Sequence, residues 1–194
     1  NCLGFAYAGQ EDWAKAVAEF VQAAEGAQAA GDERAANFWS QAGNAAFAGD
    51  DEQAALKYLA TALEQDTLDG LLKGEVHLDM ARVHVALNQY DEAKRQFALV
   101  HQLVPEDPLG WLLSATLARR MGDLAQAKTD IATAARLVTT DPAIALEAGN
   151  IAYEAGDLVN AKGSWQQAVK FGPDSPAAKA ATRYLAQLED SMAE

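Results

Sequence analysis

The sequence predicts an all-α protein, an α-solenoid of stacked helix pairs closed by a capping helix at its C-terminal end. Pro108, Pro142 and Pro176 recur at a spacing of 34 residues, and each follows an aspartate or a serine. Because these residues cap helices and proline is well tolerated in the first helical turn, each proline marks a helix start. A Gly-Asp turn at 122–123 and again at 156–157 marks a second start in each unit. Two helices per 34-residue period are typical of a solenoid.

The second helix of each unit carries an alanine, followed four residues later by a large side chain. Two antiparallel helices approach closely only where one of them presents a small residue. We therefore expect the alanines at the helix crossings and the large residues in the gaps between successive pairs. The alanines are Ala16, Ala54, Ala93, Ala127 and Ala161, and the large residues are Phe20, Tyr58, Phe97, Ile131 and Trp165.

The period divides the chain into a single solenoid domain, 1–194, with five units and a cap. The units span about 1–30, 33–66, 74–107, 108–141 and 142–175, and the cap helix spans 176–190. One irregularity interrupts the period between Asp66 and Glu75. The extra residues there either lengthen a helix or form a loop.

These units resemble the tetratricopeptide repeat (TPR), whose signature is W-x2-L-G-x2-Y…A-x3-F…P. The second-helix half of the signature recurs throughout the chain, whereas the first-helix half is more degenerate. His77 and Ala145 stand where the tryptophan is expected, and Thr139 stands where Pro105 and Pro173 occupy the corresponding place. The resemblance implies a right-handed superhelix of helix pairs whose first helices line a concave groove.

Charge and composition exclude several classes of partner. The 194 residues carry a formal net charge of −13. Nucleic acids and anionic lipids require a basic surface, so neither is expected as a partner. No apolar run approaches the roughly 18 residues that cross a bilayer, so direct membrane insertion is not expected. The single cysteine, Cys2, cannot form an internal disulfide.

The sequence does not indicate an enzyme. It contains no phosphate-binding glycine loop, no H-E-x-x-H motif and no cysteine cluster. His77, Met80 and His84 share one helical face, but no carboxylate or cysteine completes a ligand set, which favours packing between helices. We therefore expect no catalytic residue, no cofactor and no metal.

The family resemblance implies which first-helix positions face the groove. They form three columns: Asn44, Arg82, Thr116, Asn150 and Tyr184; Phe47, Val85, Arg119, Tyr153 and Gln187; and Ser40, Leu78, Leu112, Leu146 and Ala180. From these columns and the adjacent Arg120 we select a hypothetical peptide-binding set. The set consists of Asn44, Phe47, Arg82, Leu112, Thr116, Arg119, Arg120, Asn150, Tyr153 and Tyr184.

The chemistry of this set predicts a non-catalytic interaction module, a scaffold or adaptor that binds a peptide or protein segment. A side-chain amide offers both a donor and an acceptor to a peptide backbone. Arg82, Arg119 and Arg120 form a basic spot suited to an acidic group on the partner. Because a solvated helix face tolerates substitution, Arg119→Glu is expected to leave folding nearly intact.

Two alternatives remain open at this point. The columns can be a merely solvated helix face with no ligand. The chain can also serve assembly, forming a homo-oligomer or docking into a larger complex through its ends or convex face. Apolar residues near the N-terminal end, such as Leu3 and Phe5, favour such pairing.

Overall fold

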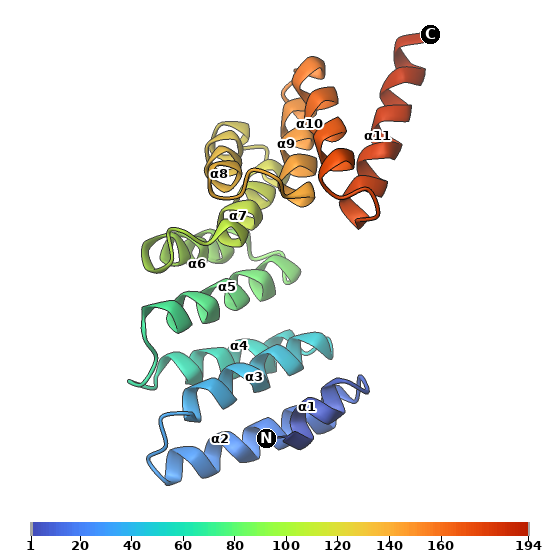
Figure 1. Cartoon of the computed structure of the whole chain (residues 1–194). Helices are drawn as coiled ribbons and strands as arrows, with labels where there is room; N and C mark the ends of the chain where they lie inside the picture. Colours follow the sequence, from blue (N-terminus) through green and yellow to red (C-terminus); the bar gives the residue numbers. More distant parts are fainter. Residues whose placement is uncertain (1, 194) are drawn as a thin grey trace. The chain divides into compact units, whose positions relative to one another are not determined.

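The protein is all-α, as the periodicity predicts. The computed structural model describes the backbone of residues 2–193 and the side chains of residues 2–190. Eleven helices occupy the described part of the chain (Figure 1). They are α1 (Cys2–Ala8), α2 (Trp13–Ala29), α3 (Ala35–Ala48), α4 (Glu52–Leu63), α5 (Gly70–Ala86), α6 (Tyr90–Leu103), α7 (Pro108–Arg120), α8 (Leu124–Leu137), α9 (Pro142–Glu154), α10 (Leu158–Phe171) and α11 (Pro176–Ala193).

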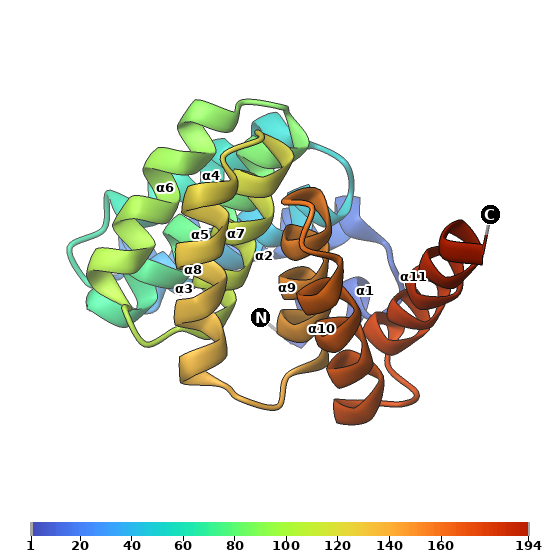
Figure 2. The same cartoon turned by 90° about the horizontal axis from the view of Figure 1, so that it is seen from above.

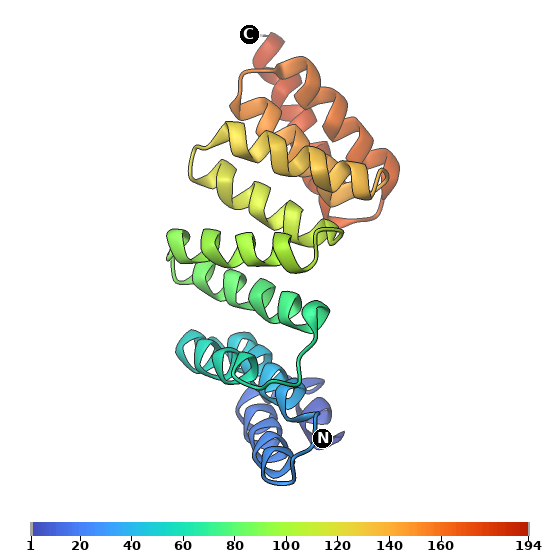
Figure 3. The same cartoon turned by 90° about the vertical axis from the view of Figure 1, so that its left-hand side faces the viewer.

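The helices pack in sequential antiparallel pairs within two compact units, residues 1–105 and 106–194. In the first unit α1 pairs with α2, α3 with α4 and α5 with α6, and the last of these pairs is clear in Figure 3. In the second unit α7 pairs with α8 and α9 with α10. Helix α11 then packs against both α10 and α9 (Figure 2), which is the position expected of a capping helix.

Helices α7, α9 and α11 begin at the three predicted prolines. The Asp107 carboxylate accepts hydrogen bonds from the backbone amides of Leu109 and Gly110, each at 3.0 Å. Asp141 caps α9 in the same way. The Ser175 hydroxyl accepts from the third residue of α11 at 3.0 Å. These bonds satisfy amides that have no partner inside the helix, which is why each helix starts where it does.

The residues 66–75 that interrupt the period do both things the sequence allowed. They supply the connection after α4 and the first turn of α5. Helix α5 is accordingly long, with 17 residues, whereas α7 has 13. Asp69 caps α5 through the amide of Leu72 at 2.8 Å. Gly74 lies inside α5, and a Cβ there would lie 2.7 Å from Val104 Cγ2. The glycine therefore permits close packing against the end of α6.

The predicted crossing in α4 is wrong by one residue. Ala55 and Leu59 are fully buried at this crossing, whereas the predicted pair, Ala54 and Tyr58, is only partly buried. A Cβ added at Gly43 of α3 would lie 2.7 Å from Leu59 Cγ, which places Leu59 in the gap between the helices.

The error arises in the turn before α4. The pattern Gly49-Asp50 imitates the later Gly-Asp turns, but the left-handed residue is Asp50, with φ of 59°. The next residue, Asp51, is the helix cap and accepts from the amide of Ala54 at 2.9 Å. Aspartate tolerates the left-handed region better than most residues because its short side chain bonds locally. The turn is therefore Asp50-Asp51, and every position in α4 moves by one.

The same small-against-large pairing recurs in all five helix pairs. The small residue lies on the first helix and the large one on the second, 16 positions later in the chain. A Cβ added at Gly4, Gly43 or Gly149 would overlap the large partner. The two remaining small residues, both alanines, and their partners are buried at the equivalent positions. The pairs are Gly4 and Phe20, Gly43 and Leu59, Ala81 and Phe97, Ala115 and Ile131, and Gly149 and Trp165.

Gly156 tests whether the left-handed conformation in the turns requires glycine. Its φ is +78°, a conformation that a Cβ disfavours, so Gly156→Ala is expected to lower the free energy of unfolding by about 1–2 kcal/mol. Gly163 is the matched control, because it lies inside α10 with nothing within 4 Å of an added Cβ. Gly163→Ala should raise the free energy of unfolding by about 0.5–1 kcal/mol. Urea unfolding measures both, and two changes of the same sign would contradict this account.

Candidate functional site

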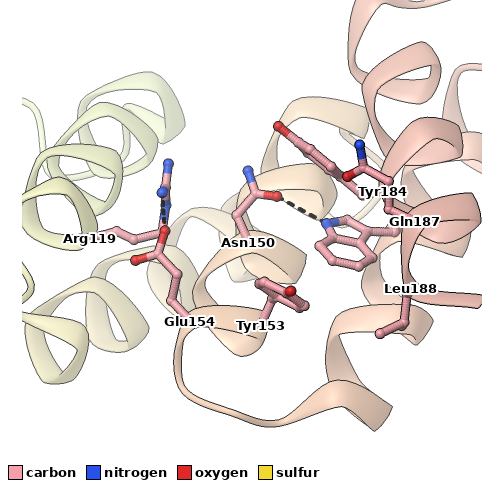
Figure 4. A pocket seen from close by; sticks show the side chains of 8 residues that line it. Arg119, Asn150, Tyr153, Glu154, Tyr184, Gln187 and Leu188 are labelled. Carbon is pink, nitrogen blue, oxygen red and sulfur yellow. Dashed lines mark hydrogen bonds and ion pairs between the residues drawn. The ribbon is translucent and has the colours of Figure 1, made fainter. Parts of the chain in front are cut away.

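The second unit contains a pocket of about 290 Å³ between α9, α10 and α11, with one side chain contributed by α7 (Figure 4). Four residues of the predicted set line it: Arg119, Asn150, Tyr153 and Tyr184. The other lining residues are Glu154, Trp165, Gln187 and Leu188. Figure 4 shows Arg119 and Glu154 on one side of the pocket and Gln187 and Leu188 of α11 on the other.

One wall of the pocket is an ion cluster. Arg119 Nε donates to Glu147 Oε1 at 2.7 Å, and Arg119 Nη1 donates to Glu154 Oε1. Only 18% of the Arg119 side chain is exposed. Burial disfavours its charged form, but the hydrogen bonds to Glu147 and Glu154 outweigh this effect and raise the Arg119 pKa above its ordinary value. The arginine therefore stays charged, and one positive charge faces two carboxylates.

Asn150 is held in a fixed orientation in the centre of the site. Its Oδ1 accepts from Trp165 Nε1 at 3.0 Å, and its Nδ2 donates to Glu147 Oε2 at 3.3 Å. An amide has two N–H donors and two acceptor lone pairs, so these bonds use half of its capacity. The remaining donor and acceptor can serve a ligand without disturbing the two internal bonds.

Three aromatic rings form the opposite wall. Trp165 is buried, and its ring centroid lies 5.6 Å from that of Tyr153 and 5.3 Å from that of Tyr184. The two tyrosines are 51% and 39% exposed. Trp165, predicted to be a packing residue, therefore fills the helix gap and also supports two accessible tyrosine rings.

Other residues of the predicted set in the second unit do not line this pocket. Leu112 is partly buried against the core shared by α7, α8 and α9. Thr116 donates its hydroxyl hydrogen to the carbonyl oxygen of Leu112 at 3.0 Å, back along its own helix. Arg120 is exposed at the end of α7. Residues of the predicted set in the second unit therefore differ in role: some line the pocket, whereas the side chains of Leu112, Thr116 and Arg120 do not reach it.

In the first unit, Arg82 and Phe47 lie together. The Arg82 guanidinium carbon is 5.8 Å from the centre of the Phe47 ring, and Arg82 Nη1 forms an ion pair with Asp79 at 3.2 Å. Asn44 is half-buried on the same helix as Phe47. A separate pocket of about 340 Å³ lies elsewhere in this unit. Its apolar wall consists of Phe5, Phe38, Leu68, Leu72 and Val76.

Sequence reasoning missed the two glutamates. Glu154 follows Arg119 by 35 positions, about one repeat period, whereas Glu147 follows it by only 28. A search for opposite charges one period apart would have found Glu154 but not Glu147. The column analysis could not find the two glutamates, because it selects positions by the helix face that they occupy. It does not compare the charge of a residue with the charges in the next repeat.

Among the described residues, no three or more histidine, cysteine, aspartate and glutamate side chains are placed to hold a metal ion. Of the helices in residues 2–193, none is both long and apolar enough to span a bilayer.

Comparison with known proteins identifies the repeat. The family model for the tetratricopeptide repeat matches residues 46–117. No match was found among curated proteins. A tetratricopeptide repeat protein from Parabacteroides merdae has 13% sequence identity and a TM-score of 0.78, covering 98% of this chain and 71% of that one.

Two further solved structures share the fold. YrrB, described as a TPR protein with an unusual peptide-binding site, has 18% identity and a TM-score of 0.68, covering 93% of this chain and 88% of that one. The APC/C hetero-tetramer Cut9-Hcn1 contains a chain with 18% identity and a TM-score of 0.64. That match covers 72% of this chain but only 26% of the other. The helix pairs, the repeated small-against-large crossings and these matches agree: residues 46–117 match the tetratricopeptide repeat family, and the chain has the fold of tetratricopeptide repeat proteins.

Proposed function

We propose that the chain is a non-catalytic protein-interaction module and that the pocket of its second unit binds a peptide or protein segment. The observation that carries the proposal is the oriented Asn150 amide beside two exposed tyrosine rings. A peptide backbone needs both a donor and an acceptor, and its side chains need apolar surface. The peptide-binding site reported for YrrB lends support from a protein of the same fold.

The pocket size favours a side chain of a segment over a free small molecule. Its volume of about 290 Å³ is at the lower end of the roughly 300–1,000 Å³ typical of small-molecule sites. Tyr153 and Tyr184 are partly exposed, so an anchored side chain can remain attached to a longer chain outside. Aromatic residues with this partial exposure are common anchors in protein interfaces.

The sequence also predicted an acidic group on the partner. At Arg119 the structure removes the basis for that prediction, since Glu147 and Glu154 already surround the guanidinium. A ligand carboxylate in this pocket would meet one positive and two negative charges. The other two arginines of the predicted basic spot, Arg82 and Arg120, do not line the pocket, and Arg82 is itself paired with Asp79.

Peptide capture tests the proposal. On a peptide array, Tyr153→Ala and Tyr184→Ala are each expected to lower capture at least about fivefold, because each removes an exposed anchor ring. Val159→Ser is the matched control, since Val159 is 83% exposed on α10 and does not line the pocket. Circular dichroism verifies that each variant is folded. Equal capture by the wild type and both tyrosine variants would place binding elsewhere.

The second candidate function is assembly. Leu3 and Phe5 are 56% and 54% exposed on α1, an unusual exposure for large apolar side chains. Cut9-Hcn1 shows that a chain with this fold can be part of a hetero-tetramer. Light scattering over a range of concentrations separates the two functions. A tight dimer that dissociates in a Leu3→Ser/Phe5→Ser variant would favour assembly, and a persistent monomer would favour segment binding.

A further inference from the structure

We propose that the pocket of the second unit takes a basic side chain of the bound segment, arginine in preference to lysine. This inference rests on the proposed function and adds the chemical class of the group that is recognised. The three arginines of the predicted set suggested an acidic group on the partner, and this inference replaces it with a basic one. Two independent features of the pocket support it: an excess carboxylate and two accessible aromatic faces.

The first feature is the charge that remains after the internal ion pairs have formed. Glu147 is buried and is held by both Arg119 and Asn150. Glu154 is 41% exposed, lines the pocket and pairs with Arg119 through Oε1. Within the described residues, Glu154 Oε2 makes no hydrogen bond. One negative charge and one carboxylate oxygen are thus available at the pocket surface.

The second feature is the pair of tyrosine rings. Tyr153 precedes Glu154 at the end of α9, and Tyr184 approaches from α11 on the far side of Trp165. Figure 4 shows Tyr153 next to Glu154, so the aromatic wall begins beside the ion cluster. The face of an aromatic ring is negative and attracts a cation placed over it. A basic side chain that lies against an exposed tyrosine ring can therefore direct its charge toward Glu154 while its methylene groups contact that ring.

Arginine fits this arrangement better than lysine. Its guanidinium is planar, stacks on aromatic faces and presents several N–H donors, whereas the ammonium of lysine is compact and strongly hydrated. The net charge of −13 adds a general attraction for basic segments. A carboxylate ligand would be repelled by the same charges, and a neutral side chain would gain only the aromatic contact.

Capped amino acids test the inference without a known partner. The probes are Nα-acetyl amides of arginine, lysine, norleucine and glutamate, added to the whole chain at low salt. The reporter is the NMR signal of the Trp165 indole N–H, assigned by its loss in Trp165→Phe. The arginine probe is expected to shift this signal at millimolar concentration, with lysine weaker and norleucine at least about fivefold weaker. Norleucine or glutamate binding as tightly as arginine would overturn the inference.

A charge-matched pair of variants distinguishes binding in the pocket from attraction by the net negative charge of the protein. Glu154→Gln is expected to weaken binding of the arginine probe about two- to fivefold, as removal of a partly exposed charge partner does. Glu106→Gln removes the same charge at an exposed position that does not line the pocket, and should leave binding unchanged. Equal weakening in both variants would show attraction by net charge alone and would overturn the assignment to this pocket.

The two proposals can fail separately. If the arginine probe does not bind while peptide capture still depends on Tyr153 and Tyr184, the proposed function stands and the basic-side-chain inference fails. If capture is also independent of both tyrosines, the proposed function fails as well. If the inference is correct, peptides captured on the array will be enriched in arginine, and their capture will fall as salt rises.

Discussion

Arg119→Glu is expected to lower the free energy of unfolding of the second unit by about 3–5 kcal/mol, the cost of breaking a buried ion pair. The substitution removes the cation that holds Glu147, which is buried, and adds a third carboxylate to the cluster. The earlier expectation, that this change leaves folding nearly intact, assumed a solvated helix face. The structure instead places most of the Arg119 side chain out of solvent.

Two controls define the origin of the loss. Arg183→Glu makes the same charge change at an exposed position of α11 and should alter stability little. Arg119→Met alone should be strongly destabilising, whereas Arg119→Met combined with Glu147→Met should recover most of the loss, since no buried charge remains unpaired. Hydrogen exchange of the α9 amides measures each variant. The ion-pair explanation fails if Arg119→Glu costs no more than Arg183→Glu.

Arg119 also shows how far a repeat period can predict a site. The period, read together with the family resemblance, places Arg119, Asn150, Tyr153 and Tyr184 in groove columns, and all four line one pocket. It does not predict how each side chain is engaged, because that depends on residues outside the columns. Glu147 is one such residue, and its pairing with Arg119 changes the expected charge of the ligand.

The fold was more predictable than the site, because helix starts depend on local chemistry. An aspartate or serine before proline specifies a cap within three residues, so the starts of α7, α9 and α11 were predicted correctly. The crossing in α4 was missed for an equally local reason. Asp50 adopts the left-handed conformation that Gly122 adopts in its own turn. Gly49, one residue earlier, made Gly49-Asp50 resemble the later Gly-Asp turns, so α4 was aligned one residue too early.

The small-against-large crossings lead to the second large effect, in Gly149→Ala. A Cβ at Gly149 would overlap Cδ1 and Nε1 of the Trp165 ring, well inside van der Waals contact. Trp165 is buried and lies between Tyr153 and Tyr184, so the ring cannot turn away freely. We expect a loss of about 3 kcal/mol in the free energy of unfolding, at the upper end of the usual cost of overpacking.

The neighbouring helix pair supplies the compensating change. Where the small residue is Ala115, the large residue opposite is Ile131, and both are buried. Trp165→Ile alone should cost about 2–4 kcal/mol, because it leaves a cavity beside Gly149. Gly149→Ala/Trp165→Ile recreates the Ala115 and Ile131 combination and should be more stable than the sum of the single changes predicts.

A double-mutant cycle on urea unfolding measures this coupling, which we expect to be about 2 kcal/mol. A coupling near zero would mean that Gly149 and Trp165 do not share a tight crossing. The cycle also bears on the binding site, because Trp165 supports both tyrosine rings and donates to Asn150. A folded Gly149→Ala/Trp165→Ile variant should therefore keep the helix crossing but lose the pocket, so that its peptide capture falls while its stability recovers.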